Sequence, residues 1–158
     1  MGAVWDESAR AGFTELLPEG HEFPEFKPEL WPALLEQEGV RILVAEEPGE
    51  PGLLGYTAYG ANRDPDAGPD VGEVRTFFVH SRAWRRGVGT AMIQRALSDL
   101  RETGYAEATV WSFSDNARAN AFYEHHGFER DGAERREEAW AEILEVRYRR
   151  AVPQAVTA

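Results

Sequence analysis

Two glycines that follow two arginines form the clearest candidate ligand site in this sequence. Gly87 and Gly89 come after Arg85 and Arg86, where the strand-like run 71–80 gives way to a helical pattern. Glycine lets the backbone approach a bound anion closely, and the N–H groups of a first helical turn point at that anion with the helix dipole behind them. The pattern predicts a phosphate-binding turn, although a tight turn without a ligand has the same sequence. It has neither the third glycine of the dinucleotide fingerprint nor the Lys-Ser/Thr pair of a P-loop.

The elements around this turn alternate between helical and strand-like patterns. Apolar residues recur at helical spacing in the helices that we expect, and they alternate or run together in the strands. We expect helices over 4–17, 29–38, 88–103 and from Ser114 or Asp115, as the capping residue, to about 126. We expect strands over 40–47, 53–60, 71–80, 106–112, 128–130 and 143–149. This order predicts an α/β fold with one sheet and helices on both of its faces.

The strand over 71–80 presents two different faces if its residues alternate regularly. Its alternation predicts one face with Val74, Thr76 and Phe78, and an opposite face with Glu73, Arg75, Phe77 and Val79.

Length and composition exclude several classes of protein. The 158 residues amount to about one domain, so we expect a single domain over 1–158. The sequence has no cysteine, which excludes a disulfide scaffold, a thiolate nucleophile and a zinc site built on sulfur. With four histidines we expect no metal site. No apolar run is long enough to span a bilayer and the start does not resemble a signal peptide, so we expect a cytoplasmic protein without a membrane partner.

Negative charge is concentrated in the first third of the chain. The net charge is −11, which argues against a nucleic-acid partner because phosphate backbones select basic surfaces. Residues 1–50 hold twelve Asp and Glu against three basic residues. This part of the surface either attracts a cationic partner or is simply a solvated acidic face.

Two segments together resemble the GNAT superfamily of acyl-coenzyme A-dependent N-acyltransferases. The first is VGEVRTFFVHSRAWRRGVGTAMI, residues 71–93, which is similar to the family's coenzyme A strand and pyrophosphate loop. The second is WSFSDNARANAFYEHHGF, residues 111–128, which is similar to its N-x-x-A-x-x-F-Y-E-x-x-G-F segment. The resemblance covers about residues 40–150. It implies a mixed, mostly antiparallel sheet with helices on both faces and a splayed strand pair that binds coenzyme A.

The resemblance also implies where the cofactor, acetyl-coenzyme A, would bind as a co-substrate. Backbone groups of Phe78 and Val79 would hydrogen-bond the pantetheine arm as an added strand does. Asn116 stands where the family contacts the same arm. Backbone N–H groups would hold the pyrophosphate, and they belong to Arg85, Arg86, Gly87, Val88, Gly89 and Thr90.

Two residues occupy positions with catalytic roles in the family. Tyr123 stands where many members place a hydroxyl near the thioester sulfur, and a phenol of ordinary pKa about 10 can donate a proton to the departing thiolate. The alternative for Tyr123 is packing of the helix onto the sheet. Glu73 stands where several members carry the glutamate that deprotonates the acceptor amine, and its alternative is an ion pair with a nearby arginine. An acyl-enzyme on sulfur is impossible, so direct transfer in a ternary complex is expected.

The sequence departs from the family pattern at two places. The family's loop usually has Gln or Arg three residues before its first glycine, and Trp84 stands there in this chain. The family also opens with a strand, whereas only Met1–Val4 precede the first expected helix. That strand is missing, replaced, or encoded before Met1.

The expected activity is acetyl transfer to a primary amine that is a small molecule. In this family the first helices usually wall the acceptor side, and carboxylates there would favour a cationic amine. These are Glu15, Glu19, Glu22, Glu25 and Glu29. The alternatives are a non-catalytic acyl-coenzyme A-binding module and a protein N-acetyltransferase. A homodimer is compatible with the sequence, which does not determine the oligomeric state.

Overall fold

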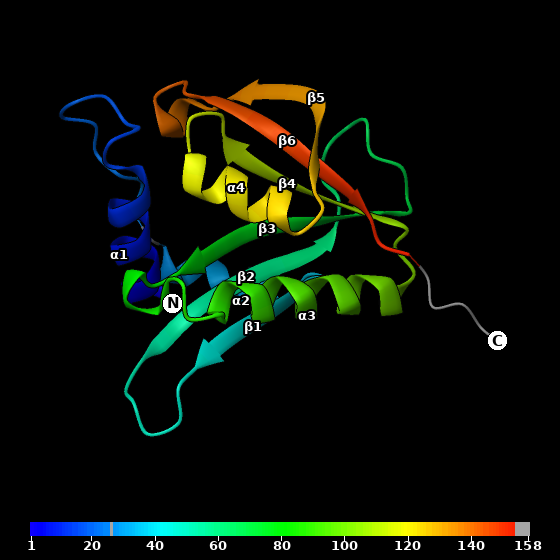
Figure 1. The fold of residues 1–158 in the computed structure, drawn as a ribbon, viewed down its shortest axis with the longest axis horizontal. Coiled ribbons are helices and arrows are strands. Elements are labelled where there is room, and N and C mark those ends of the chain that lie inside the picture. Colours follow the sequence, from blue (N-terminus) through cyan, green and yellow to red (C-terminus); the bar gives the residue numbers. More distant parts are fainter. Residues whose placement is uncertain (26, 154–158) are drawn as a thin grey trace.

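A six-stranded sheet forms the centre of the structure, with its strands in the order β1-β2-β3-β4-β6-β5 (Figure 1). The computed structural model describes residues 1–25 and 27–153. The strands are β1 (Arg41–Glu46), β2 (Leu53–Ala61), β3 (Val71–Val79), β4 (Glu107–Phe113), β5 (Glu129–Arg136) and β6 (Leu144–Ala151). β3 and β4 pair in parallel, and the other four pairings are antiparallel. The sheet is therefore mixed and mostly antiparallel, which confirms the expected fold class.

Helices cover both faces of this sheet. They are α1 (Gly2–Phe13), α2 (Trp31–Leu35), α3 (Val88–Thr103) and α4 (Ala117–His125). The two faces can be told apart at consecutive residues of β3, because Phe77 contacts Phe122 and Tyr123 of α4 whereas Phe78 contacts Phe13 of α1. Helix α1 lies beside the end of β3 (Figure 1). It ends four residues earlier than expected, at Phe13, and the N–H and the hydroxyl of the next residue, Thr14, both donate to the carbonyl of Arg10.

The main core lies between the sheet and the α3–α4 face. Ile93, Leu97 and Leu100 of α3 are buried against Val74 of β3 and Val110 of β4. Helix α3 has the bounds that the sequence predicts. It ends at Gly104, whose φ of 101° is left-handed and suits glycine.

A bulge in β3 overturns the expected alternation of that strand. Ala58 of β2 pairs with Thr76, but the next residue, Tyr59, pairs with Val74, so Arg75 has no opposite residue. An extra residue of this kind exchanges the two faces of the strand beyond it. Val74 and Phe77 consequently share the α3–α4 face, and the prediction that Val74 shares a face with Phe78 was wrong.

The parallel pairing of β3 with β4 is short. It joins Val71–Val74 to Glu107–Val110, and no pair is formed beyond Val74. The second half of β3, residues 75–79, therefore diverges from β4. This is the splayed strand pair that the resemblance implied.

An arginine of β6 fixes the loop between β2 and β3 onto the sheet. The Arg147 side chain is 5% exposed and donates to Asp64 at 3.0 Å, to Asp66 at 2.7 Å and to Asp131 at 2.7 Å. These contacts hold the pKa of Asp66 down at about 2, with the hydrogen bond from Arg147 as the main cause. Because Asp64 and Asp66 belong to the β2–β3 loop, the network sets where that loop lies above the sheet.

The ends of the chain complete the description. Within the described residues no strand precedes α1, and none of their helices has the length and apolar character needed to cross a membrane. Strand β5 extends to Arg136, well past the expected end at 130, because it pairs with β6 as far as Leu144.

Candidate active site

The turn between β3 and α3 leaves backbone N–H groups without helical partners. Arg85 and Gly87 have left-handed backbone, with φ of 59° and 83°, and Gly87 caps α3. Ala91 donates to the carbonyl of Gly87 at 2.9 Å, in the first turn of the helix. The N–H groups of residues 88–90 therefore lie at the positive end of the helix dipole with no carbonyl of α3 to bind. This arrangement suits a phosphate or diphosphate.

The two glycines of the turn are needed for different reasons. Gly87 has open space around its missing Cβ, and its positive φ is what favours glycine there. At Gly89 a Cβ would lie 3.3 Å from the ring of Phe122. Gly89 therefore allows the start of α3 to pack closely on α4, which brings the turn beside the second motif.

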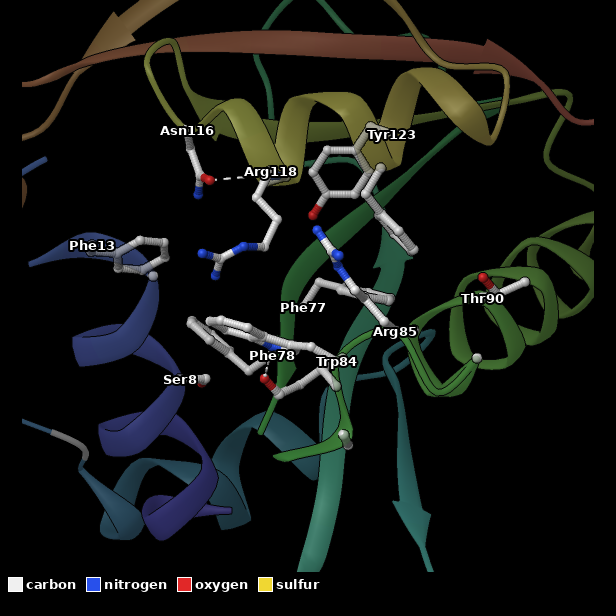
Figure 2. Close-up of a pocket in the computed structure, with 17 residues that line it drawn as sticks. Ser8, Phe13, Phe77, Phe78, Trp84, Arg85, Thr90, Asn116, Arg118 and Tyr123 are labelled. Atoms are coloured by element: carbon white, nitrogen blue, oxygen red, sulfur yellow. Dashed lines mark hydrogen bonds between the residues drawn. The ribbon is translucent and has the colours of Figure 1, made fainter. Parts of the chain in front are cut away.

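A cavity of about 350 Å³ opens beside this turn (Figure 2), and we call it the loop cavity. Among the residues that the sequence predicted for the site, eight line it: Phe78, Val79, Arg85, Gly87, Gly89, Thr90, Asn116 and Tyr123. Arg86, Val88 and Glu73 do not. The side chain of Arg86 instead contacts Glu47 of the β1–β2 loop at 2.7 Å. The structure thus brings both sequence motifs to one cavity.

Trp84 and Arg118 both line the loop cavity and contact each other (Figure 2). The Arg118 guanidinium carbon lies 3.8 Å from the centre of the Trp84 ring, which is a cation–π contact. The Trp84 indole N–H donates to the carbonyl of Val79 at 2.8 Å. Trp84 therefore fixes the turn to the end of β3 through its own side chain, where the family usually has Gln or Arg.

Asn116 is the capping residue of α4, in place of the expected Ser114 or Asp115. Its side-chain oxygen accepts from the N–H of Ala119 at 3.2 Å. Ser114 and Asp115 instead bond to each other, and the chain enters the helix one residue later than expected. The cap holds Asn116 at the edge of the loop cavity.

Tyr123 is buried between the sheet and α4, with 6% of its surface exposed. Its ring packs against Phe77, Phe122 and Phe128 at centroid distances of 5.5–6.3 Å. Figure 2 shows its hydroxyl directed toward the cavity, and no residue in the described ranges hydrogen-bonds to it. Burial raises the pKa of Tyr123 well above its ordinary value, so the phenol stays protonated.

A second cavity, of about 550 Å³, lies between the diverging halves of β3 and β4, and we call it the sheet cavity. It shares six lining residues with the loop cavity: Phe13, Phe77, Phe78, Asn116, Ala119 and Tyr123. The two cavities therefore adjoin at these six residues, and we call this place, which includes Tyr123, the junction.

Glu73 lines the sheet cavity and is paired with an arginine. Arg63 donates to Glu73 Oε2 at 2.9 Å and to Oε1 at 2.7 Å, and the carboxylate is buried. Oε1 accepts this one hydrogen bond, so one of its two acceptor positions stays open. The structure thus shows the ion pair that was the alternative for Glu73, and the carboxylate still lies in the wall of the cavity.

A second carboxylate, Glu145, has a similar position that the sequence did not indicate. It is buried in the wall of the sheet cavity, and Arg135 donates to it at 2.6 Å. Burial raises the pKa of Glu145, and Arg135 opposes that shift. Because the turn after β5 brings Arg135 and Glu145 together, the sequence pattern of either strand alone gave no sign of the pair.

The five acidic residues expected on the acceptor wall are not there. Glu15, Glu19, Glu22, Glu25 and Glu29 are exposed and line neither cavity. Helix α1 contributes Trp5 and Phe13 to the sheet cavity instead. These carboxylates lie outside both cavities because α1 turns its apolar side to the sheet. Glu15 stands just past the end of α1, and the other four follow in the segment before α2.

Sequence reasoning also missed Arg118, Arg63 and the rings of Trp111 and Trp140. Arg118 had a signal, as the one basic residue between Asn116 and Tyr123. The other three had none, since only the paired strands bring them to the sheet cavity.

A helix N-terminus beside diverging strands, with a second cavity adjoining the first, is an arrangement that suits a phosphorylated ligand and a second molecule. The profile of the acetyltransferase (GNAT) family matches residues 5–128. This chain belongs to that family, as its two motifs indicated.

Relatives and solved structures agree with this assignment. A probable N-acetyltransferase of Mycobacterium tuberculosis is 32% identical over 66% of this chain and 59% of its own length. Mycothiol acetyltransferase of Beutenbergia cavernae is 42% identical over 40% of this chain and 21% of its own length. The chain therefore spans less than two thirds of these curated relatives. The crystal structure of ribosomal-protein-alanine N-acetyltransferase from Brucella melitensis has the same fold, with a TM-score of 0.72, 19% identity and coverage of 94% of this chain and 90% of that chain.

Two buried tyrosines allow a test of whether the Tyr123 hydroxyl contributes to folding. The hydroxyl of Tyr59 donates to the buried carboxylate of Asp99, whereas that of Tyr123 has no partner in the described chain. Tyr59→Phe is expected to lower the free energy of unfolding by about 1.5–3 kcal/mol, because it removes a hydrogen bond to a charged group. Tyr123→Phe is expected to change it by less than about 0.5 kcal/mol. Urea unfolding of both variants measures the difference, and an equal loss in the two would show that Tyr123 has a structural partner.

Proposed function

We propose that this protein transfers an acetyl group from acetyl-coenzyme A to a primary amine, by direct attack in a ternary complex. The main observation behind this proposal is that the loop cavity and the sheet cavity adjoin at a junction that includes Tyr123. The loop cavity has the features of a diphosphate site, and the sheet cavity offers room for an acceptor. The GNAT family uses acetyl-coenzyme A, which supplies the activated thioester.

Residues of the loop cavity fit the parts of the coenzyme. The N–H groups of residues 88–90 and the positive charges of Arg85 and Arg118 suit its phosphates. At Phe78 and Val79, β3 has no strand partner on the β4 side, which suits the amide groups of the pantetheine arm. The Val79 carbonyl already accepts from the Trp84 indole, so the arm would pair with the other backbone groups of this edge. An arm laid along this edge leads from the turn toward Tyr123.

Tyr123 is the proposed donor of the proton that the departing sulfur takes up. The amine nitrogen bonds to the acetyl carbon, the carbon–sulfur bond breaks, and the sulfur leaves as a thiolate that is protonated from the phenol. Burial raises the pKa of a phenol and of a thiol alike, because both become anions. The same apolar junction that makes Tyr123 a weaker acid therefore makes the thiolate a stronger base.

Glu73 is the proposed acceptor of the proton that the ammonium group must lose before it can attack. Its open Oε1 position is the basis of this role, and Arg63 keeps the carboxylate in place. Glu73 takes one proton from the ammonium group, and the nitrogen loses a second proton as the amide forms. That second proton restores the phenol of Tyr123, which has protonated the sulfur, so one proton is released overall.

The alternative, a non-catalytic acyl-coenzyme A-binding module, needs the loop cavity alone. It gives no reason for a second cavity of larger volume that meets the first at a buried hydroxyl. A protein N-acetyltransferase differs from the present proposal only in the acceptor.

Coenzyme A is expected to raise the thermal midpoint of unfolding, because a ligand that binds the folded state stabilises it by mass action. Gly87→Glu is expected to abolish the shift, since it places a carboxylate where the phosphates bind. Gly132→Glu is the matched control, because Gly132 has a φ of 91° and equally open space but lies in β5. Thermal unfolding with and without millimolar coenzyme A measures both. No shift in the unmodified protein would overturn the assignment of the loop cavity.

Tyr123→Phe is expected to lower kcat by about 10²–10⁴-fold while the thermal shift by coenzyme A is kept, because the ring stays and the proton donor is lost. Since the pKa of Tyr123 is raised, the unmodified enzyme should show no loss of kcat from ionisation of this phenol up to at least about pH 10. Steady-state thiol release over pH 6–10, with chemistry shown to limit the rate, is the measurement. An unchanged kcat would leave Tyr123 a packing residue.

Glu73→Gln is expected to lose kcat/KM progressively as the pH falls from about 9 to about 6. The variant depends on the amine that is already neutral in solution, and that fraction falls about tenfold per pH unit below the pKa of the amine. Glu145→Gln is the control, since it neutralises another buried carboxylate of the same cavity and should show a loss that does not vary with pH. A constant loss in Glu73→Gln as well would count against its role as a base.

A further inference from the structure

Aromatic rings form most of the apolar wall of the sheet cavity. They come from α1, β3, β4, α4 and the turn between β5 and β6, and they are Trp5, Phe13, Phe77, Phe78, Trp111, Phe113, Tyr123 and Trp140. Segments that are distant in the sequence thus present the same kind of surface to one space. A wall of this kind favours a ligand with a flat apolar body.

Three of these rings form a cluster at the C-terminal end of α1. Phe13 lies 5.0 Å from Phe113 and 5.6 Å from Trp140, and Phe113 lies 5.4 Å from Trp140, with the rings at steep angles to each other. Edge-to-face contacts of this kind leave ring faces available to a further aromatic group. Phe13 also lines the loop cavity, so the cluster reaches the junction where the two cavities meet.

The backbone after Trp140 supports a special role for this turn. Ala141 and Glu142 both have left-handed backbone, with φ of 53° and 56°. Two consecutive non-glycine residues in this conformation are costly, and such strain is concentrated at functional positions. In this protein these two residues directly follow Trp140, which lines the sheet cavity.

The carboxylates of the cavity are already held in ion pairs. Its carboxylates pair with arginines: Glu73 with Arg63, Glu137 and Glu145 with Arg135, and Asp64 with Arg147. Each carboxylate of the described wall therefore has a cationic partner, although Arg135 serves two of them and Arg147 also binds Asp66 and Asp131. The second ammonium group of a polyamine would compete with these arginines, whereas an apolar body would displace only water.

The wall also shows where a ligand ring would lie. Arg135 covers the face of Trp111 at 4.4 Å from the ring centre, so that face is occupied. The rings of Phe13, Phe113 and Trp140 pack edge to face with each other and line the same cavity, and Phe13 also belongs to the junction with the loop cavity.

We propose that the acceptor is an arylalkylamine, a primary amine on a short alkyl chain attached to an aromatic ring. The ring lies among Phe13, Phe113 and Trp140, and the chain carries the amine to the junction at Tyr123. This inference rests on the proposed acetyl transfer and specifies its substrate. It replaces the cationic acceptor expected from the acidic first third of the chain, because those carboxylates line neither cavity.

The test compares four amines at fixed acetyl-coenzyme A. They are 2-phenylethylamine, 2-cyclohexylethylamine of the same chain length, 1,4-diaminobutane, and a tripeptide with a free α-amino group. We expect kcat/KM for 2-phenylethylamine to exceed that for the cyclohexyl analogue by about tenfold and that for the diamine by about 100-fold, as hydrophobic pockets discriminate. A tripeptide that is acetylated as fast as 2-phenylethylamine would overturn the proposal in favour of a protein acceptor.

Variants of Trp140 test whether the cluster of Phe13, Phe113 and Trp140 causes the expected preference for an aromatic amine. Trp140→Leu should lower kcat/KM for 2-phenylethylamine about tenfold or more and leave that for the diamine nearly unchanged, and Trp140→Phe should restore part of the loss. Phe23→Leu is the matched control, because Phe23 packs against Arg10 outside both cavities. The thermal shift by coenzyme A shows that each variant is folded.

The outcomes separate the two proposals. A coenzyme A shift with acetylation of amines but no preference for the aromatic ring overturns this inference and leaves acetyl transfer standing. A coenzyme A shift without acetylation of 2-phenylethylamine also overturns it. If coenzyme A fails to bind, the proposed function fails and the inference fails with it.

Discussion

The divergence of β3 from β4 is the constraint on which the rest of the site depends. The two strands are parallel neighbours for four residue pairs and then separate, so the second half of β3 has no strand partner on one side. Unpaired strand edges recruit other extended chains, and here the edge faces a cavity rather than solvent. The same divergence makes room for the sheet cavity. One change in strand pairing thus provides both halves of the candidate active site.

The two helices that follow these strands supply the remaining walls of the loop cavity. Helix α3 begins at the end of β3 and directs free N–H groups at the loop cavity, and α4 begins after β4 and places Tyr123 at the junction. Gly89 allows the two helices to pack closely, since its missing Cβ leaves room for Phe122. The position of the tyrosine relative to the turn is therefore fixed by packing, not by loop conformation.

Ion pairs between buried and half-buried groups hold several segments of this protein in place. Arg147 fixes the β2–β3 loop, and that loop supplies Arg63 to Glu73 and Asp64 to the indole N–H of Trp111. Breaking one buried partner leaves the other uncompensated, which is why such networks hold loops firmly. The acidic first third of the chain lies outside this arrangement, on the surface.

The sequence by itself determined the family, the order of helices and strands and the residues around the phosphate-binding turn, because these depend on local patterns of apolar residues, glycines and caps. Only the tertiary structure decided the faces of β3, since the bulge at Arg75 forms against β2 and leaves no local signal. The same is true of the sheet cavity. Glu145, Arg135, Trp140 and Phe13 come from distant segments that meet only when the sheet and α1 have packed. Long-range pairing of this kind follows from the whole fold, so no single segment of sequence contains it.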